Sequence, residues 1–217
     1  MQKEYKTVFQ EAVAEFEEKK SRFIATVRPV TTEEEAVEFI NRLKSKYWDA
    51  THNVYAYHIG GETVQQRFSD DGEPSGTAGL PVLEVMKRRG VQDVVVVVTR
   101  YFGGTLLGAA GLIRAYGKSA ALGLEAARVI KRQLCAEVKV IVEYTLFGKV
   151  QNTILAGGYP VKETLYEQDV EITVYVGVDE VGHFMETLTE VTNARCILEV
   201  ADKTFVTVDE EGKIIMD

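Results

Sequence analysis

The spacing of hydrophobic and polar residues divides the chain into short strands and helices. Val94–Val98 is an uninterrupted run of five valines. A strand with one face in water would alternate hydrophobic and polar residues, so this run predicts a strand that is buried on both faces. A glycine bend at Gly103 and Gly104 follows, and glycine there lets another backbone or a ligand come close. A long helix is then expected from about Leu107 to Ala127.

The amino-terminal residues predict a hairpin followed by a helix. Residues 8–16 and 21–30 are strand-like, and the polar run Glu17–Lys20 supplies the turn between them. The following stretch, residues 31–50, carries hydrophobic residues at helical spacing. Thr32 and Glu35 form a capping box, which is typical of a helix start.

A second hairpin and a second helix are expected before the valine strand. Gly60-Gly61 separates two strand-like segments and marks the hairpin turn. Ser69–Gly76 is rich in turn residues and reads as a loop. In the helix that follows, Thr77 is the expected N-cap, Pro81 fits the first turn, and Gly90 ends the helix.

The rest of the chain predicts the order βαββαβ. Strands are expected at residues 136–144, 158–168, 169–177 and 196–206, with helices at 144–158 and after an N-cap at Asp179. This is the split βαβ order of ferredoxin-like domains, in which we expect the first and last strands to be antiparallel neighbours. Cys135 and Cys196 each begin one of these two strands, so they are expected at opposite ends and too far apart for a disulfide.

Together these elements predict an α+β protein with two domains. A ββαββαβα domain is expected in residues 1–133 and a ferredoxin-like βαββαβ domain in residues 134–217. The boundary is expected near Lys131–Leu134, and 217 residues are enough for two such domains.

The charge is divided unevenly between the two parts of the chain. The net charge is −8, but residues 1–133 hold 19 Lys+Arg against 17 Asp+Glu, while residues 134–217 hold 6 against 16. The balance is therefore +2 in the first part and −10 in the second. Within the first part, the segment Arg100–Arg132 contains a single acidic residue, Glu125, and six cations, and we call it the basic strip. Its cations are Arg100, Arg114, Lys118, Arg128, Lys131 and Arg132. This local excess indicates an acidic partner for the first domain.

Composition excludes several classes of protein. The longest apolar run is far shorter than the roughly 20 residues that span a bilayer. The amino terminus has no apolar core of a signal peptide, so a cytoplasmic location and no membrane partner are expected. Cys135 and Cys196 are isolated, with no CxxC, so reduced thiols are expected rather than a zinc site.

Four stretches of the chain together resemble a known family. They are RFSDDGEPSGTAGLPVL (Arg67–Leu83), VVTRYFGGTLLGAAGLIRAYG (Val97–Gly117), KSRFIA (Lys20–Ala25) and THNVYAY (Thr51–Tyr57). In these segments the chain closely resembles the YigZ/IMPACT family, in its bacterial-type form. Ala110 departs from the family pattern, which has a second glycine before Gly111.

The resemblance implies both a fold and a cellular context. Members of the family are similar to domains IV and V of elongation factor G, a ribosomal-protein-like α+β domain followed by a ferredoxin-like one. The eukaryotic relatives act in translational control through an additional amino-terminal domain that is not expected in this chain. A role linked to translation or its regulation is therefore what the resemblance implies.

The candidate binding residues surround the glycine bend. Arg114 and Lys118 are one helical turn apart and share a face, and Arg100 leaves the valine strand just before the bend. Cations with aromatic neighbours suit RNA, where phosphates supply affinity and rings stack on unpaired bases. The candidate nucleic-acid- or anion-binding residues are Arg67, Arg100, Tyr101, Phe102, Gly103, Gly104, Thr105, Arg114, Tyr116 and Lys118. The alternative is a solvated helix face, with Arg100 paired to an acidic residue of the 70–73 loop.

Other chemical readings have weaker support. The glycine loop contains no GxGxxG and no Gly-Lys-Ser/Thr, so close backbone packing is favoured over a phosphate cradle. Asp70, Asp71 and Glu73 would suit Mg²⁺ or acid–base chemistry, but Asp-Asp-Gly-Glu-Pro is also a tight-turn sequence. His52 and His58 lack a third ligand nearby, and no GxSxG elbow is present. We therefore expect no metal and no cofactor, and we assign no catalytic residue.

The second domain is expected to bind no RNA itself. If Val170, Ile172 and alternate residues after them face the core, the open sheet face shows Glu171, Thr173 and Tyr175. An RNA-recognition sheet needs several exposed aromatic residues and few carboxylates. A basic protein surface is the more suitable partner for this acidic face.

Three hypotheses follow from the sequence. The first is a non-enzymatic factor that binds RNA or the ribosome through the basic strip. The second is a small hydrolase or nucleotide- or anion-binding enzyme that uses the Asp70–Glu73 loop with Arg100. The third is a protein-interaction module that acts through the acidic second domain.

Overall fold

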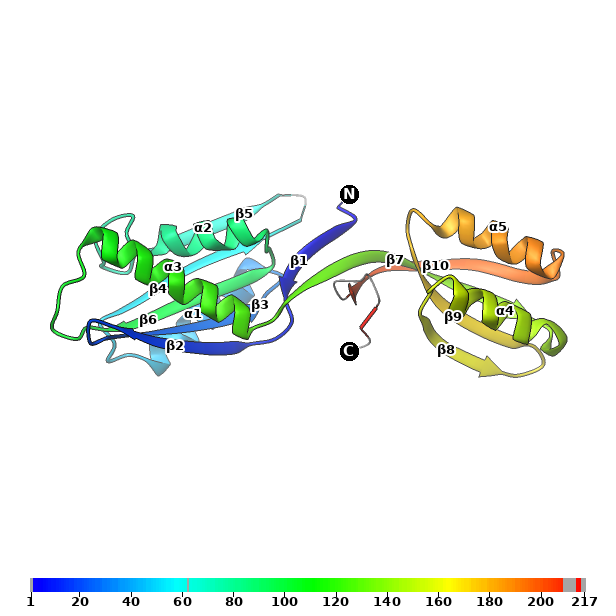
Figure 1. Ribbon diagram of the computed structural model, residues 1–217, viewed down its shortest axis with the longest axis horizontal. Coiled ribbons are helices and arrows are strands. Elements are labelled where there is room, and N and C mark those ends of the chain that lie inside the picture. Colours follow the sequence, from blue (N-terminus) through cyan, green and yellow to red (C-terminus); the bar gives the residue numbers. More distant parts are fainter. Residues whose placement is uncertain (1, 62, 209–213, 216–217) are drawn as a thin grey trace. The chain divides into compact units, whose positions relative to one another are not determined.

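The computed structural model describes residues 2–61, 63–208 and 214–215 and shows an α+β protein (Figure 1). Contacts within the chain divide it into two units. One unit is Tyr5–Ile130, and the other joins the residues up to Glu4 with those from Lys131 onward. None of the helices in the described part is long and apolar enough to cross a membrane.

The first unit is built on an antiparallel sheet with the strand order β2-β3-β6-β4-β5. Its strands are β2 (Ala12–Glu18), β3 (Ser21–Pro29), β4 (His52–Ile59), β5 (Gln65–Ser69) and β6 (Val94–Tyr101). Its helices are α1 (Glu33–Lys46), α2 (Gly79–Arg89) and α3 (Ala109–Ala126). The expected hairpin around Gly60-Gly61 is confirmed, because β4 pairs with β5.

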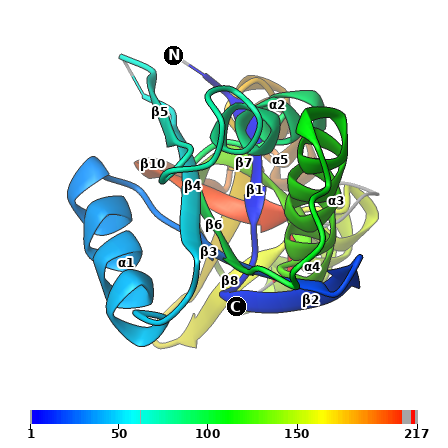
Figure 2. The ribbon, with the colours of Figure 1, turned by 90° about the vertical axis from the view of Figure 1, so that its left-hand side faces the viewer.

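The valine strand β6 lies in the middle of this sheet and separates two hydrophobic cores. Val94, Val96 and Val98 pack with residues of α2 and α3. Val95 and Val97 pack with residues of α1 on the opposite face. Figure 2 shows α2 and α3 on one side of the sheet and α1 on the other. All five valines are fully buried, so the predicted burial on both faces is confirmed.

The amino-terminal hairpin differs from the expectation at its first strand. Residues 8–16 do not form one strand, because β1 (Glu4–Val8) and β2 are separate. Between the two strands, the amide of Phe9 donates to the carbonyl oxygen of Arg128 (2.9 Å), just after α3. The polar turn is confirmed, with positive φ angles at Lys19 (47°) and Lys20 (68°).

Several helix ends follow the sequence signals. Glu35 N donates to the hydroxyl of Thr32 (3.2 Å), and the Glu35 carboxylate accepts from Thr31 N (2.7 Å), so the capping box is confirmed in a slightly shifted form. Helix α2 ends at Gly90, whose φ of 66° is left-handed as expected for a C-cap glycine. Helix α3 begins at Ala109, slightly later than predicted.

The second unit has the predicted order βαββαβ. Its elements are β7 (Val129–Val142), α4 (Tyr144–Ala156), β8 (Val161–Tyr166), β9 (Val170–Gly177), α5 (Val181–Thr192) and β10 (Cys196–Val208). The pairings give the order β10-β7-β9-β8, and β1 also pairs with β7. The first and last strands of this unit, β7 and β10, are antiparallel neighbours as expected.

The two cysteines lie at opposite ends of that strand pair. Cys135 is opposite Thr204, whereas Cys196 is opposite Val142. Both thiols are free, which confirms the expectation that no disulfide joins them.

Helix α5 does not have the predicted cap. Its N-cap is Glu180, with no side-chain hydrogen bond to the first turn. Asp179 instead forms an exposed ion pair with Lys3 (2.5 Å). The expectation that Asp179 caps this helix is therefore wrong, because its carboxylate is directed to a lysine from the start of the chain.

Candidate nucleic-acid interface

Arg100, the arginine of β6, is buried and neutralised. Its side chain continues the row of Val94, Val96 and Val98 that faces α2 and α3, and the residue is only 4% exposed. Its Nη1 donates to Oε1 of Glu73 at 2.6 Å. The expectation that Arg100 binds a nucleic acid or another anion together with the α3 cations is wrong. The structure contains the alternative stated above, an ion pair between Arg100 and the acidic loop.

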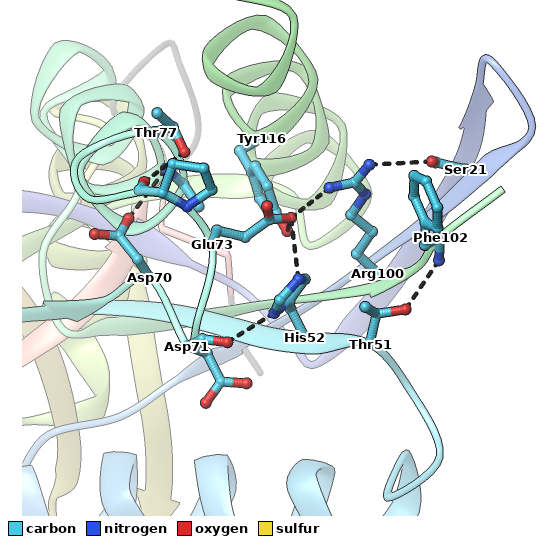
Figure 3. A network of polar contacts seen from close by, with 12 residues as sticks. Ser21, Thr51, His52, Asp70, Asp71, Glu73, Thr77, Arg100, Phe102 and Tyr116 are labelled. Atoms are coloured by element: carbon cyan, nitrogen blue, oxygen red, sulfur yellow. Dashed lines mark hydrogen bonds and ion pairs between the residues drawn. The ribbon is translucent and has the colours of Figure 1, made fainter. Parts of the chain in front are cut away.

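Glu73 is the centre of a polar network that joins four elements (Figure 3). Its Oε1 also accepts from the hydroxyl of Tyr116 on α3 (2.7 Å). On β4, His52 places Nε2 3.8 Å from the same oxygen. The Nδ1 of His52 lies 2.8 Å from the carbonyl oxygen of Asp71, and it must donate because a carbonyl only accepts. Ser21 on β3 accepts from Nη2 of Arg100 (3.2 Å), so the network ties β3, β4, β6 and α3 to the loop after β5.

The aromatic candidates beside Arg100 divide into buried and exposed residues. Tyr116 is fully buried against Phe23, with ring centroids 5.3 Å apart, so the expectation that it can stack on a base is wrong. Burial, followed by the bond to Glu73, raises the pKa of Tyr116 far above its usual value. Tyr101 donates to Asp49 (2.9 Å), and burial raises its pKa. Phe102 remains 46% exposed.

The acidic loop has a structural role at the start of α2. The carboxylate of Asp70 accepts from the amides of Gly76 (2.9 Å), Ala78 (3.1 Å) and Gly79 (2.8 Å). Thr77 was expected as the N-cap, and this is wrong, because its hydroxyl donates to the carbonyl of Pro74 (2.6 Å). Asp70 therefore satisfies the free amides of the helix start from the preceding loop.

The carboxylate of Asp71 also has its hydrogen-bond partners within the fold. Its carboxylate accepts from the amide of Asn53 (2.6 Å) and from Nζ of Lys44 (2.8 Å). With Glu73 bound to Arg100, the three acidic residues of the loop stabilise a turn, and the geometry does not favour acid–base chemistry. Among the residues that the structure describes, no group of three or more His, Cys, Asp or Glu side chains could hold a metal ion.

Close packing against the hairpin turn explains why position 103 in the bend is a glycine. A Cβ atom at this position would lie 2.0 Å from the carbonyl of Lys20, so no other residue fits without moving β3. Its amide donates to the hydroxyl of Ser21 (3.2 Å). Gly104 has a φ of 80°, and Thr105 is exposed beyond the bend. This part of the candidate site packs against the hairpin turn and forms no phosphate cradle.

The remaining cations line two hollows along α3. Arg114 and Lys118 are exposed and border both of them. The smaller hollow, of about 250 Å³, lies toward β2 and includes Phe16. The larger, of about 500 Å³, lies between α2 and α3, and we call it the α2–α3 groove. It is lined by Val85, Arg88, Arg89, Ile113, Arg114, Gly117, Lys118 and Ala121.

Among the residues with described positions, most cations of the α2–α3 groove have no acidic partner. Nε of Arg88 donates to a backbone carbonyl of its own helix, as does Nε of Arg114. Nζ of Lys118 lies 4.4 Å from the centroid of Phe16. Within the described ranges, Arg89 is the one groove cation in an ion pair, a long one of 3.8 Å to Glu125. The groove therefore carries positive charge that carboxylates in the described part of the chain do not neutralise.

Two differences separate this groove from the site expected from sequence. Arg67 does not belong to it, because Arg67 is paired with Glu33 of α1 at 3.2 Å. Arg88 and Arg89 belong to it but were not among the expected residues. They end α2 with a basic last turn, which is common in helices because cations favour the helix C-terminus, so they do not stand out in the sequence.

The open sheet face of the second unit is mixed rather than uniformly polar. Glu171 and Tyr175 are partly exposed as expected, but Thr173 is only 2% exposed, so its expected exposure is wrong. Glu171 binds Lys139 (2.7 Å) and lies in a cross-strand row with three apolar residues. Across the strands this row is Ile197, Ile141, Glu171 and Leu165.

Comparison with known proteins places the chain in a family. Residues 19–124 match the Impact N-terminal domain, and residues 140–195 match a domain of unknown function, DUF1949. The IMPACT family member YvyE of Bacillus subtilis is 45% identical over 202 residues, which is 93% of each chain. This chain belongs to the IMPACT family. Another IMPACT family member, from Thermus thermophilus, is 37% identical over 83% of this chain and 98% of its own.

The fold of this IMPACT family protein also has a solved counterpart. A crystal structure described as that of a hypothetical protein matches with a TM-score of 0.59 and 27% identity. The match covers 93% of this chain and 99% of the other, so it includes both units.

Proposed function

We propose that this IMPACT family protein is a non-enzymatic factor linked to translation, and that it binds RNA through the α2–α3 groove. The observation that carries the proposal is the set of exposed cations Arg88, Arg114 and Lys118, which have no carboxylate partner in the part of the chain that the structure describes. Cations of this kind supply most of the affinity of a protein for a phosphate backbone. The link to translation is supported by the family to which the chain belongs.

The surroundings of these cations support RNA over a small anion. Ile113 is 45% exposed beside Arg114, and Val85 and Ala121 also line the groove. Apolar groups between cations suit a ligand that has both phosphates and flat rings. A free phosphate would use the cations and leave the apolar groups in water.

Titration of a labelled single-stranded RNA at several salt concentrations tests the proposal. Three phosphate contacts predict that log K falls with log salt with a slope of about −2. The double substitution Arg114→Ala and Lys118→Ala removes two contacts and should bring the slope to about −0.7. Lys149→Ala is the matched control, because Lys149 is exposed on α4, outside the groove.

Two results would contradict the proposed function. One is no binding to RNA at low salt, where electrostatic affinity is greatest. The other is equal weakening by the double substitution and by Lys149→Ala, which would mean that the groove has no special part in binding.

A second candidate function is binding of a basic protein by the acidic second unit. It is favoured by the row in which Ile141 and Leu165 flank Glu171 and the exposed Ile197 lies beyond Ile141, since apolar anchors around a charge are typical of protein interfaces. Cross-linking of the full-length protein to partners should be lost in Ile197→Arg and retained in Val13→Arg, which changes an exposed apolar residue of the first unit. Equal retention in both variants would exclude this face.

A further inference from the structure

Gly117 is a glycine in the middle of α3 that the packing of the fold does not require. A Cβ atom there would meet one atom, Cγ2 of Val85, at an ordinary contact distance of 3.7 Å. Gly123 in the same helix is different, because its Cβ would lie 2.8 Å from Val27 and 2.9 Å from Ala25. Glycine is among the poorest helix formers, so alanine at position 117 would favour the helix. Because Gly117 has no side chain, the wall of the α2–α3 groove is open at this position.

The groove around Gly117 has an apolar wall and a charged rim. Ile113 and Ala121 lie one turn before and after Gly117 on the same face of α3, and Val85 faces them from α2. Arg88, Arg89, Arg114 and Lys118 surround this apolar strip. The groove has a volume of about 500 Å³ and is open to solvent.

We propose that the α2–α3 groove receives an unpaired base of single-stranded RNA, with its ring against Gly117 and Val85 and its flanking phosphates on the rim cations. The inference rests on the proposed function and specifies its ligand. A duplex does not suit this arrangement, because the flat faces of its bases are stacked inside the helix and none is free to lie against Gly117. The positive rim selects an anionic chain, and the open wall at Gly117 admits a flat ring.

The test compares two RNA chains with equal charge. One is a labelled chain of uridines, and the other is a ribose–phosphate chain of the same length without bases. Fluorescence anisotropy at low salt should show the uridine chain binding at least about 5-fold more tightly, which is the lower end of the range for one stacked base. Chains with equal numbers of phosphates should have equal salt slopes.

Substitutions then separate the base from the phosphates. Gly117→Leu should fill the groove and remove the preference for the uridine chain over the abasic chain. Gly148→Leu is the matched control, because Gly148 lies within α4 with no atom within 4 Å of its Cβ position. Ile113→Ser should also reduce the preference for the uridine chain. Because Ile113 is exposed, this variant tests the groove even if Gly117→Leu fails to fold. Arg114→Ala should weaken both chains equally.

Each contrary result has a distinct meaning. Equal binding of the two chains by the unsubstituted protein overturns the base-binding inference and leaves the proposed function in place. Failure of both chains to bind at low salt overturns both proposals. A preference that survives Gly117→Leu places the base elsewhere. Equally tight binding of a polyglutamate peptide assigns the groove to an acidic protein segment and overturns the inference.

Discussion

Arg100 and Arg114 belong to the same basic stretch of sequence and have opposite environments. Arg100 lies on the face of β6 that packs under α2 and α3, whereas Arg114 lies on the solvent side of α3. The position of Arg100 follows from strand geometry, because alternate residues of a strand share a face and Val94, Val96 and Val98 are in the core. Its charge is therefore matched inside the protein, by Glu73.

Removing Arg100 should destabilise the protein strongly. Arg100→Ala leaves the carboxylate of Glu73 buried without its ion pair, and we expect the free energy of unfolding in urea to fall by about 3–5 kcal/mol. Tyr116→Phe removes one hydrogen bond to the same carboxylate and should lower it by about 1.5–3 kcal/mol. A change below about 1 kcal/mol for Arg100→Ala would contradict the burial of this pair.

Cys135 should make stability depend on alkaline pH. Burial, followed by the nearby charge of Glu180, raises the pKa of its thiol from 9.0 to about 11. The neutral thiol is the favoured form in the folded state, so its stabilisation is complete below pH 9 and is lost as pH rises toward 11. Urea unfolding at pH 8 and pH 10.5 should therefore show a larger loss in the unsubstituted protein than in Cys135→Ala. Equal losses would contradict the raised pKa.

At the scale of elements, local signals predicted β6, the α1 capping box and the α2 C-cap at Gly90, because each depends on residues close together in sequence. The start of α2 was not predictable in this way. Its cap, Asp70, lies 8 and 9 residues before the amides of Ala78 and Gly79. The groove was missed in part for the same reason, since Arg88 and Arg114 meet only when α2 packs on α3.

Asp70→Ala should weaken the start of α2. The substitution leaves three amides without their carboxylate acceptor, and we expect a loss of about 1–2 kcal/mol in the free energy of unfolding. Glu84→Ala is the control on the same helix, because its ion pair with Lys87 is exposed and contributes little. If Thr77→Ala destabilised the protein more than Asp70→Ala, the assignment of the cap would be wrong.

At the scale of the whole molecule, the net charge of −8 conceals a local positive surface. The excess of carboxylates over cations lies in residues 134–217, with 16 Asp+Glu against 6 Lys+Arg, whereas the cations of the α2–α3 groove all lie before residue 119. Net charge is therefore a poor guide to what the groove binds.

This separation predicts an unusual chromatographic behaviour. At pH 8 the protein should be retained by an anion exchanger, because of its net charge, and also by heparin, because of the groove. The triple substitution Arg88→Ala, Arg114→Ala and Lys118→Ala should abolish retention on heparin and strengthen retention on the anion exchanger. Unchanged elution from heparin would show that its sulfates contact another surface.

The burial of Arg100 bears on how genetic screens of this protein are interpreted. A screen that scores only growth or ligand capture would rank Arg100 above Arg114, because collapse of the interior eliminates every activity at once. Protease resistance recorded for each clone would expose such false positives, since Arg114 variants should survive digestion and Arg100 variants should not.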